Sequence, residues 1–186
     1  MHEMILCKLG EVVLKGLNRR SFEMKLMSNL RRRTARFGRF RVYSKQSTIY
    51  VEPAGEACDL DGAYDACKRV FGIIAVARAL PCAKEKEAIL DTAKTYLSSA
   101  LTAARSFKVE SKRADKTFPM TSPELMRELG AYLLGRHNYL RVDVKNPQFK
   151  VIVEIRDYGA YIHGPKIQGE GGLPVGTSGR ALNMLS

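Results

Sequence analysis

The stretch FRVYSKQSTIYV, residues 40–51, decides the fold expected for the first part of the chain. It holds two runs rich in β-branched and aromatic residues, 40–44 and 48–51, which the polar Lys45-Gln46-Ser47 separates. This pattern predicts two antiparallel strands joined by a tight turn.

A helix of about twenty residues is predicted before the hairpin. Phe22, Leu26 and Leu30 recur at helical spacing, Asn18 suits the N-cap, and Gly38 suits the stop. Residues 4–9 and 12–14 precede this helix as short apolar runs typical of strands. After the hairpin come a helical stretch, 60–71, and an apolar run, 73–80. The order β-α-β-β-α-β is that of a ferredoxin-like unit, which we expect to end near residue 80.

A second α/β domain is predicted for residues 81–165. Apolar residues recur at helical spacing over residues 84–104, a strand is predicted at 107–112, and Thr121 and Glu124 form a capping-box pattern before a helix that ends near Gly135. Residues 142–144, 149–155 and 160–162 read as strands, the last two joined as a hairpin. Residues 169–179 contain five glycines without periodicity, so residues 166–186 are expected to be a connector and not part of either core.

Composition narrows the function classes. The longest apolar run, residues 73–77, is far shorter than the ~20 residues of a membrane span, and the first residues lack a basic leader, so we expect a cytoplasmic protein without a membrane partner. The four cysteines have no metal-ligand spacing. There is no phosphate-binding Walker loop and no nucleophile elbow, and His2, His137 and His163 are isolated in sequence. We expect no catalytic centre, metal or cofactor in these residues.

Charge points to a polyanionic partner. The net charge is +12, and residues 1–50 hold twelve Lys and Arg against three Glu, a net of +9. A row of cations on the first helix and just before it is predicted to bind phosphates, the competing interpretation being a solvated helix face. Its members are Lys15, Arg19, Arg20, Arg32 and Arg36.

Two further cationic regions are predicted in the second domain. Lys108, Lys112, Arg113 and Lys116 lie along a strand and the loop after it, where Phe118 either stacks on a base of single-stranded RNA or belongs to the core. Lys145 and Asn146 form a turn after a strand, and Arg127 and Arg136 on the preceding helix either extend this surface or are solvated charges.

Three stretches carry a resemblance to a known family. Residues 10–23, GEVVLKGLNRRSFE, resemble the opening signature of tRNA 4-thiouridine synthases, sulfurtransferases that are also tied to thiamine biosynthesis. Residues 112–116, KRADK, resemble a segment of their THUMP domain, and residues 171–179, GGLPVGTSG, resemble the lead-in to their catalytic domain. The resemblance covers essentially the whole chain.

The resemblance implies a separate role for each part of the chain. It implies that residues 1–80 form an N-terminal ferredoxin-like domain and that residues 81–165 form a THUMP domain, which engages the CCA-bearing 3′ end of tRNA beside the acceptor stem. It also implies that residues 180–185 are the strand before an ATP pyrophosphatase loop, of which Ser186 is the first serine. The parent enzyme is then expected to use ATP, Mg²⁺ and persulfide sulfur from a cysteine desulfurase to thiolate a uridine near position 8. We expect the chain itself to bind tRNA without catalysing this reaction, and a homodimer stays open.

Two alternatives stay open beside this interpretation. The chain is either the THUMP-containing half of another RNA-modifying enzyme, such as a methyltransferase or deaminase, or a nonspecific basic RNA-binding module. The lead-in at residues 171–179 argues against the first alternative. Binding that ignores removal of the CCA end would favour the second.

Overall fold

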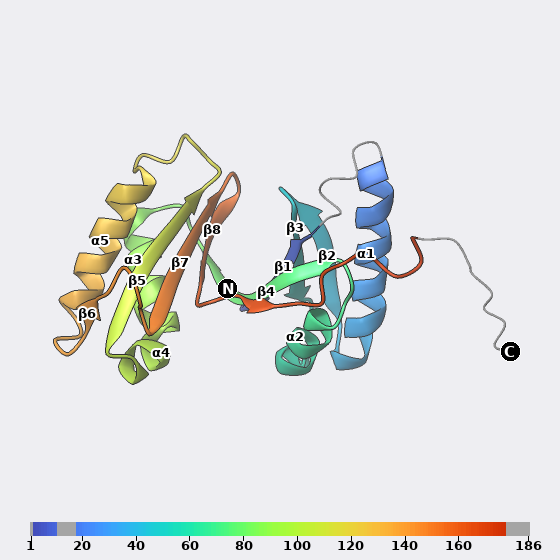
Figure 1. Cartoon of the computed structure of the whole chain (residues 1–186), viewed down its shortest axis with the longest axis horizontal. Helices are drawn as coiled ribbons and strands as arrows, with labels where there is room; N and C mark the ends of the chain where they lie inside the picture. Colours follow the sequence, from blue (N-terminus) through green and yellow to red (C-terminus); the bar gives the residue numbers. More distant parts are fainter. Residues whose placement is uncertain (1, 11–17, 178–186) are drawn as a thin grey trace, which may run out of the picture. The chain divides into compact units, whose positions relative to one another are not determined.

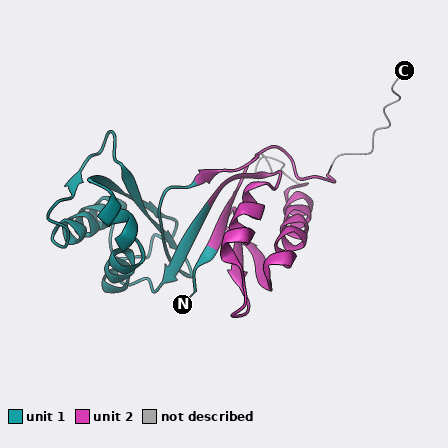
Figure 2. Ribbon diagram, turned by 90° about the horizontal axis from the view of Figure 1, so that it is seen from below, with its two compact units in different colours: residues 1–4, 77–166 teal, residues 5–76, 167–186 magenta. Residues whose placement is uncertain are grey.

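The computed structural model of the protein describes residues 2–10 and 18–177, which fall into two compact units (Figures 1 and 2). The first unit comprises residues 5–76 together with the segment that begins at residue 167, and the second comprises residues up to 4 together with 77–166. Val12–Leu14, predicted as a strand, and residues 180–186, predicted as a strand and loop start, lie outside the described residues. No helix in the described ranges is long and apolar enough to cross a membrane.

The first unit has the predicted β-α-β-β-α-β order, which confirms the ferredoxin-like topology as far as the described residues reach. Its elements are β1 (Met4–Leu9), α1 (Arg19–Thr34), β2 (Phe40–Lys45), β3 (Thr48–Pro53), α2 (Leu60–Lys68) and β4 (Ile73–Cys82). The strands lie in the order β2-β3-β1-β4, and α1 and α2 lie on the same side of them (Figure 1). β4 is shared, since its residues up to Val76 belong to the first unit and the rest to the second.

The hairpin and the helix stop are confirmed. β2 and β3 pair in register from Phe40↔Pro53 to Lys45↔Thr48, leaving a two-residue turn. Gln46 and Ser47 both have positive φ, 47° and 58°, which gives the turn a twist that matches the strands. After α1, a short 3-10 turn leads to Gly38 at φ 124°, where a Cβ would lie 2.9 Å from the Cα of Cys58. Only glycine fits that position.

The second unit packs three helices on one face of a mixed sheet (Figure 1). Its remaining elements are α3 (Lys86–Tyr96), α4 (Ser98–Ala103), β5 (Ser106–Arg113), α5 (Ser122–Leu134), β6 (Arg141–Val142), β7 (Phe149–Arg156) and β8 (Gly159–His163). The strand order is β4-β8-β7-β5-β6, with β5 parallel to both of its neighbours. The single helix predicted over residues 84–104 is wrong in one respect, because it breaks at Leu97. Leu97, at the break, and Leu101, in α4, are both buried.

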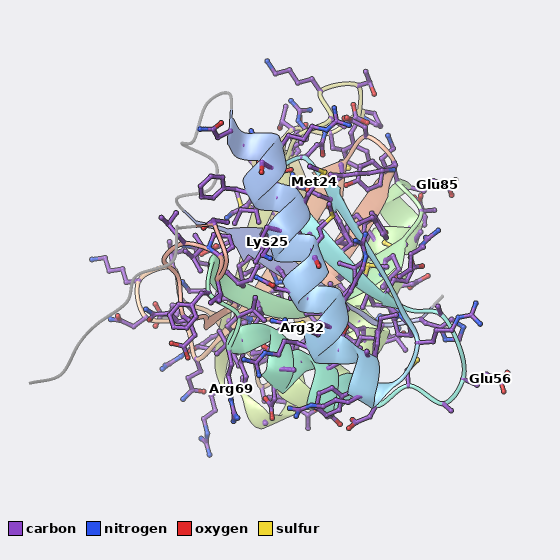
Figure 3. All side chains as sticks on the ribbon, turned by 90° about the vertical axis from the view of Figure 1, so that its right-hand side faces the viewer. Met24, Lys25, Arg32, Glu56, Arg69 and Glu85 are labelled. Carbon is purple, nitrogen blue, oxygen red and sulfur yellow. The ribbon has the colours of Figure 1, made fainter. Side chains whose placement is uncertain are left out.

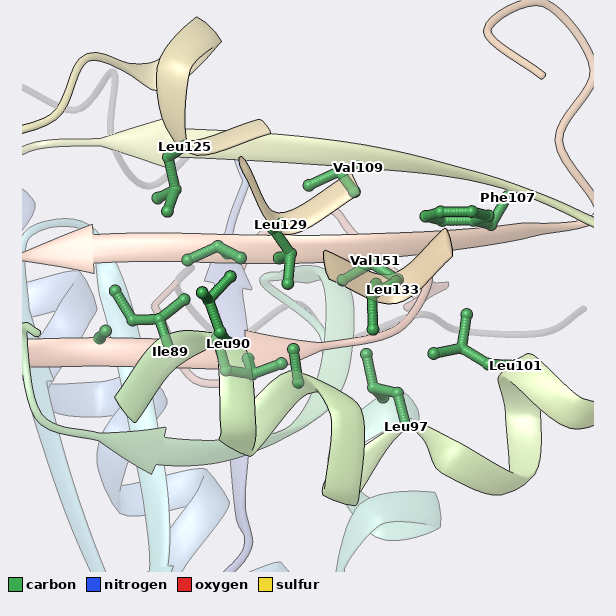
Figure 4. Close-up of a cluster of buried hydrophobic side chains, with 14 of the residues drawn as sticks. Ile89, Leu90, Leu97, Leu101, Phe107, Val109, Leu125, Leu129, Leu133 and Val151 are labelled. Atoms are coloured by element: carbon green, nitrogen blue, oxygen red, sulfur yellow. The ribbon is translucent and has the colours of Figure 1, made fainter. Parts of the chain in front are cut away.

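Strand alternation separates the core of the second unit from its polar face. Phe107 and Val109 of β5 pack with Leu125, Leu129 and Leu133 of α5 and with α3 and α4 (Figure 4). The intervening residues Lys108, Glu110 and Lys112 therefore project from the other face of the sheet. The predicted capping box of α5 is present, since the Thr121 side chain accepts from the Glu124 amide and the Glu124 carboxylate accepts from the Thr121 amide.

Residues 167–175 differ from the predicted connector. β9 (Ile167–Gln168) pairs antiparallel with Ala75 and Val76 of β4, and the Gly171 amide donates to the Ile73 carbonyl at 2.8 Å. A Cβ at Gly169 would lie 2.5 Å from that same carbonyl oxygen, so the glycine permits close backbone contact. This part of the glycine-rich segment is therefore fastened to the first unit by hydrogen bonds.

Candidate nucleic-acid interface

The cations of α1 differ in whether other side chains of the protein bind them. Arg19 is held in place, because it pairs with Glu23 at 2.7 Å and donates to Ser47 at 2.9 Å. Arg20, Arg32 and Arg36 are exposed, and among the described residues no carboxylate forms an ion pair with them. Lys15 lies outside the described residues. Three of the five predicted α1-region cations therefore present accessible charge.

A cationic hollow lies between the C-terminal half of α1 and the end of α2. Arg33, Arg36 and Arg69 line an opening of about 270 Å³ that also contacts Asp65, and Arg32 lines a smaller hollow beside it. We call the two openings, together with these four arginines, the arginine hollow. Figure 3 labels Arg32 on α1 and Arg69 just after α2. Sequence reasoning missed Arg69. It lies within the helical stretch predicted over residues 60–71, but only the packing of α2 on α1 brings it to Arg36.

Helix electrostatics explains part of this arrangement. Arg31, Arg32 and Arg33 occupy the last turn of α1, where cations stabilise the negative end of the helix dipole by roughly 0.3–1 kcal/mol each. Arg31 is also used structurally, since it donates to the Val42 carbonyl at 2.9 Å. A dipole carries only about half a charge, so it does not neutralise four guanidinium groups. The hollow keeps a net positive field suited to phosphate.

The loop between β5 and α5 is built around a buried carboxylate. Asp115 accepts from the Lys84 ammonium and from the amide and hydroxyl of Thr117. The Lys84 hydrogen bond, followed by those of Thr117, lowers the pKa of Asp115 to about 2. Lys84 also donates to the Asp157 carbonyl at 2.7 Å, which ties this loop to the β7–β8 turn. The loop is thus held in place by these bonds. Lys116 projects from it into solvent, and Lys112 does so from the end of β5.

Two predicted binding residues have structural roles here. Phe118 is 4% exposed and packs in the core of the second unit, so its predicted base-stacking alternative is wrong and its core alternative is right. Arg113 is half-buried and donates to the carbonyls of Phe118 and Met120, at 3.2 and 2.8 Å. Since Arg113 lies on the core-facing side of β5, it closes the loop, and its guanidinium is largely committed to these carbonyls.

A second hollow, of about 330 Å³, lies on the polar face of the sheet. Lys112 from β5, Lys150 from β7 and Lys166 after β8 line it, with Gln148 and Glu110. Lys108 and Lys150 share Glu110, at 3.3 and 3.5 Å, so part of the charge is neutralised. We call Lys112, Lys116, Lys150 and Lys166 the lysine face. Lys150 and Lys166 were missed because their convergence depends on the pairing of β7 with β5 on one side and with β8 on the other.

The third predicted region lies at the edge of this sheet. Lys145 and Asn146 are exposed in a turn whose backbone amides donate to the Asp143 carboxylate, at 3.0 and 2.9 Å. Arg127 is exposed on α5. Arg136 lies 5.4 Å from the ring centre of Tyr132, which occupies one side of its guanidinium. The structure therefore leaves Lys145, Asn146 and Arg127 available on the surface.

A buried charge cluster was not predicted from sequence. Glu154, 1% exposed on β7, contacts Arg156 at 2.6 Å, Lys166 at 2.8 Å and His163 at 3.3 Å. His163 also bonds the Gly164 carbonyl at 2.6 Å, so this histidine is structural. The cluster fixes the position of Lys166 on the lysine face. A signal existed, since Glu154 is the one charged residue in the apolar run 151–155.

Three of the four thiols lie in environments that disfavour reactivity. Cys7, Cys67 and Cys82 are buried, and the hydrogen bond that the Cys7 thiol makes with Cys67, together with burial, raises the pKa of Cys7. Burial raises the pKa of Cys82 to about 11. Nucleophilic chemistry requires the thiolate, which these environments disfavour.

Replacing Asp115 with Asn is expected to loosen the β5–α5 loop and lower the melting temperature at pH 7. The folded-state pKa of about 2 lies below the unfolded value near 3.9, so the Asp115 contribution is present above about pH 4 and fades toward pH 2. The melting difference between wild type and variant should therefore shrink as the pH falls. Thermal unfolding followed by circular dichroism checks this, with the exposed Glu56→Gln as control. An equal difference at pH 2.5 and pH 7 would contradict the role.

Comparison with known proteins supports both domain assignments. Residues 4–77 match the model of the ThiI ferredoxin-like domain, and residues 83–163 match the THUMP domain model. A probable tRNA sulfurtransferase of Acetivibrio thermocellus is 41% identical over the whole chain, which covers 48% of that protein. One of Moorella thermoacetica is also 41% identical, with 46% covered. The chain thus spans about half the length of the curated relatives that it matches.

Solved structures agree with this assignment. A 4-thiouridine synthetase in complex with RNA and ATP superposes with a TM-score of 0.77 at 32% identity, over 95% of this chain and 44% of that one. The protein PH1313 of Pyrococcus horikoshii gives a TM-score of 0.81 at 29% identity, over 95% of this chain and 58% of that one. Agreement in both domain models, in full-chain alignments and in fold leads to one conclusion. The chain belongs to the tRNA sulfurtransferase (ThiI) family, of which it carries the ferredoxin-like domain and the THUMP domain.

Proposed function

We propose that this chain is the tRNA-holding part of a tRNA uracil 4-sulfurtransferase. The arginine hollow of the first unit binds phosphates of the acceptor stem, and the lysine face of the second unit binds the single-stranded 3′ end. The observation that carries the proposal is that exposed cations, several without a carboxylate partner among the described residues, gather at these places on a chain of net charge +12. Cations neutralising phosphates supply most of the affinity of such proteins.

A second part of the proposal concerns the complete enzyme, of which this chain is a part. It is that the complete enzyme thiolates a uridine near position 8 of tRNA in the cytoplasm, with ATP, Mg²⁺ and persulfide sulfur from a cysteine desulfurase, and that it serves thiamine biosynthesis. The names of the relatives support the sulfur transfer to tRNA. A homodimer of the whole protein is part of the same proposal.

The glycine-rich segment near the end of the described residues does not offer free amides to the phosphates of ATP. These phosphates need a glycine-rich turn whose backbone amides are available, and the candidate here is the segment with Gly169, Gly171 and Gly172. The amides of Gly169 and Gly171 instead donate to the carbonyls of Ile74 and Ile73, and the Gly171 carbonyl accepts from Gly72. We therefore assign no step of the ATP chemistry to these residues.

A titration of tRNA against the chain at 50 and 200 mM salt tests the proposal. If six to ten phosphates are contacted, the affinity should fall by roughly 10³–10⁵ between these conditions. Trimming the CCA end should weaken binding of wild type. The Lys112→Gln/Lys116→Gln variant should bind trimmed and intact tRNA equally, because these two exposed lysines hold the 3′ end.

A matched control is Lys86→Gln/Lys94→Gln, which removes the same charge from α3. This variant should keep the difference between intact and trimmed tRNA. Wild-type binding that is indifferent to both trimming and salt would refute the proposal. Equal losses in the two double variants would instead indicate a nonspecific basic surface.

A further inference from the structure

An apolar hollow in the second unit shares no lining residue with the two cationic hollows described above. It lies between α5 and β5 and has a volume of about 470 Å³. Met126, Gly130 and Leu134 of α5 form one wall, and Val142 and Val144 form the other. These two valines are 50% and 66% exposed. A cluster of accessible apolar side chains around a hollow marks a binding site more often than an accident of folding.

The floor of the hollow is shaped by Gly130. A Cβ at this position would meet only the Val109 side chain, at 4.0 Å, so the absent side chain leaves space in the hollow beside β5. Met126 borders this space, and methionine adapts its shape to irregular ligands. The surface thus suits one face of a planar group.

An open strand edge runs along the same hollow. β6 pairs with β5 only at Ser106 and Phe107, and no described strand continues this edge. The Phe107 carbonyl accepts from the Asp143 amide at 3.0 Å, so by strand alternation the main-chain groups of Val109 point to the same side. Val109 lines the hollow. One backbone donor and one acceptor therefore lie beside apolar walls.

Charge at the rim indicates what the ligand carries. Arg127 lines the hollow, and the exposed Lys145-Asn146 turn follows Val144 directly. Among the described residues neither Arg127 nor Lys145 forms an ion pair. A ligand with a planar apolar body, hydrogen-bonding edges and attached anions matches this distribution.

We propose that the hollow binds one unstacked nucleobase of a single-stranded RNA segment. The base lies against Gly130 and the two valines, its edge bonds the main chain of Val109, and its flanking phosphates lie at Arg127 and Lys145. This rests on the proposed function and deepens it, because it supplies the base contact that the buried Phe118 does not make. An acidic peptide added to the β5 edge is the competing occupant, and the charge of a phosphate at both flanks favours RNA.

The test uses an RNA hairpin with a four-nucleotide 3′ overhang and four versions in which one overhang base is abasic. All carry the same number of phosphates, so they differ only in base contacts. Wild type should lose roughly five- to a hundredfold in affinity at one position, the range expected for one stacked base. Ala131→Trp places a ring in the hollow from an exposed helix position. This variant should bind the intact overhang more weakly and lose its sensitivity to that abasic position.

Two further variants separate the site from general damage. Val144→Asp should behave like Ala131→Trp, since it places a carboxylate at an exposed position on the wall. Ala103→Trp, at the exposed end of α4 and outside the hollow, should behave like wild type. Circular dichroism melting of all three confirms that each is folded before binding is compared.

The outcomes distinguish this inference from the proposed function. If wild type binds a blunt hairpin of equal phosphate number as tightly as the overhang, the proposed function fails. If wild type prefers the overhang but no abasic position matters, or if Ala131→Trp stays as sensitive as wild type, the base site is wrong and the proposed function stands. If Ala131→Trp abolishes binding of an acidic peptide and leaves RNA binding intact, the hollow is a peptide site and the inference is overturned.

Discussion

Replacing Glu154 with Gln is expected to lower the free energy of unfolding of the second unit by about 3–5 kcal/mol. The carboxylate is 1% exposed and faces Arg156, Lys166 and His163. An amide has nearly the same shape, but it removes the negative charge and leaves two cations close together at a buried position. The cost therefore comes from the cations that lose their counter-charge, not from a cavity.

Urea denaturation followed by circular dichroism measures this effect. The matched control is Glu52→Gln, which removes an equal charge from the solvent-exposed pair with Arg41 and should change the unfolding free energy little. Glu154→Gln should also weaken RNA binding, because Lys166 lines the lysine face and is held there by Glu154. A loss of less than about 1 kcal/mol would show that the cluster behaves like a surface pair.

The sequence pattern predicted those elements that depend on residues close to one another in the chain. The β2–β3 hairpin follows from two β-rich runs and a polar turn, and the start of α5 follows from Thr121 and Glu124 at capping-box spacing. Each of these is stabilised by contacts between near neighbours in the chain. Leu97 shows the limit, because an unbroken helical period over residues 84–104 does not reveal that the helix is interrupted at this residue.

Long-range packing decided what the sequence pattern did not predict. Phe118 fits a base-stacking loop as well as a core position, and only the fold of the β5–α5 loop places it inside. Arg69 joins Arg36 through the packing of α2 on α1, and the glycine-rich segment returns to β4 through backbone pairing. Since backbone groups are the same in every residue, such pairing leaves little trace in a single sequence.

The arginine hollow gives the largest expected effect on binding. Substituting Arg32, Arg36 and Arg69 together with Gln should lower the salt slope of tRNA affinity by about three, one for each lost phosphate contact. At 0.1 M salt this corresponds to a loss of roughly a hundredfold or more. The affinity for every RNA of equal length should fall alike, because phosphates carry no sequence information.

The control for this variant is Arg41→Gln. Arg41 is an exposed arginine of the same unit, but it already pairs with Glu52 and lies on β2, away from the hollow. Its removal should leave the salt slope unchanged, whereas Arg36→Gln alone should lower it by about one. If both single variants lower the slope equally, binding follows total charge and not the convergence of α1 and α2. Arg36→Gln and Arg41→Gln remove the same charge. If only substitutions in the arginine hollow lower the salt slope of tRNA affinity, the acceptor-stem contact is therefore assigned to the hollow.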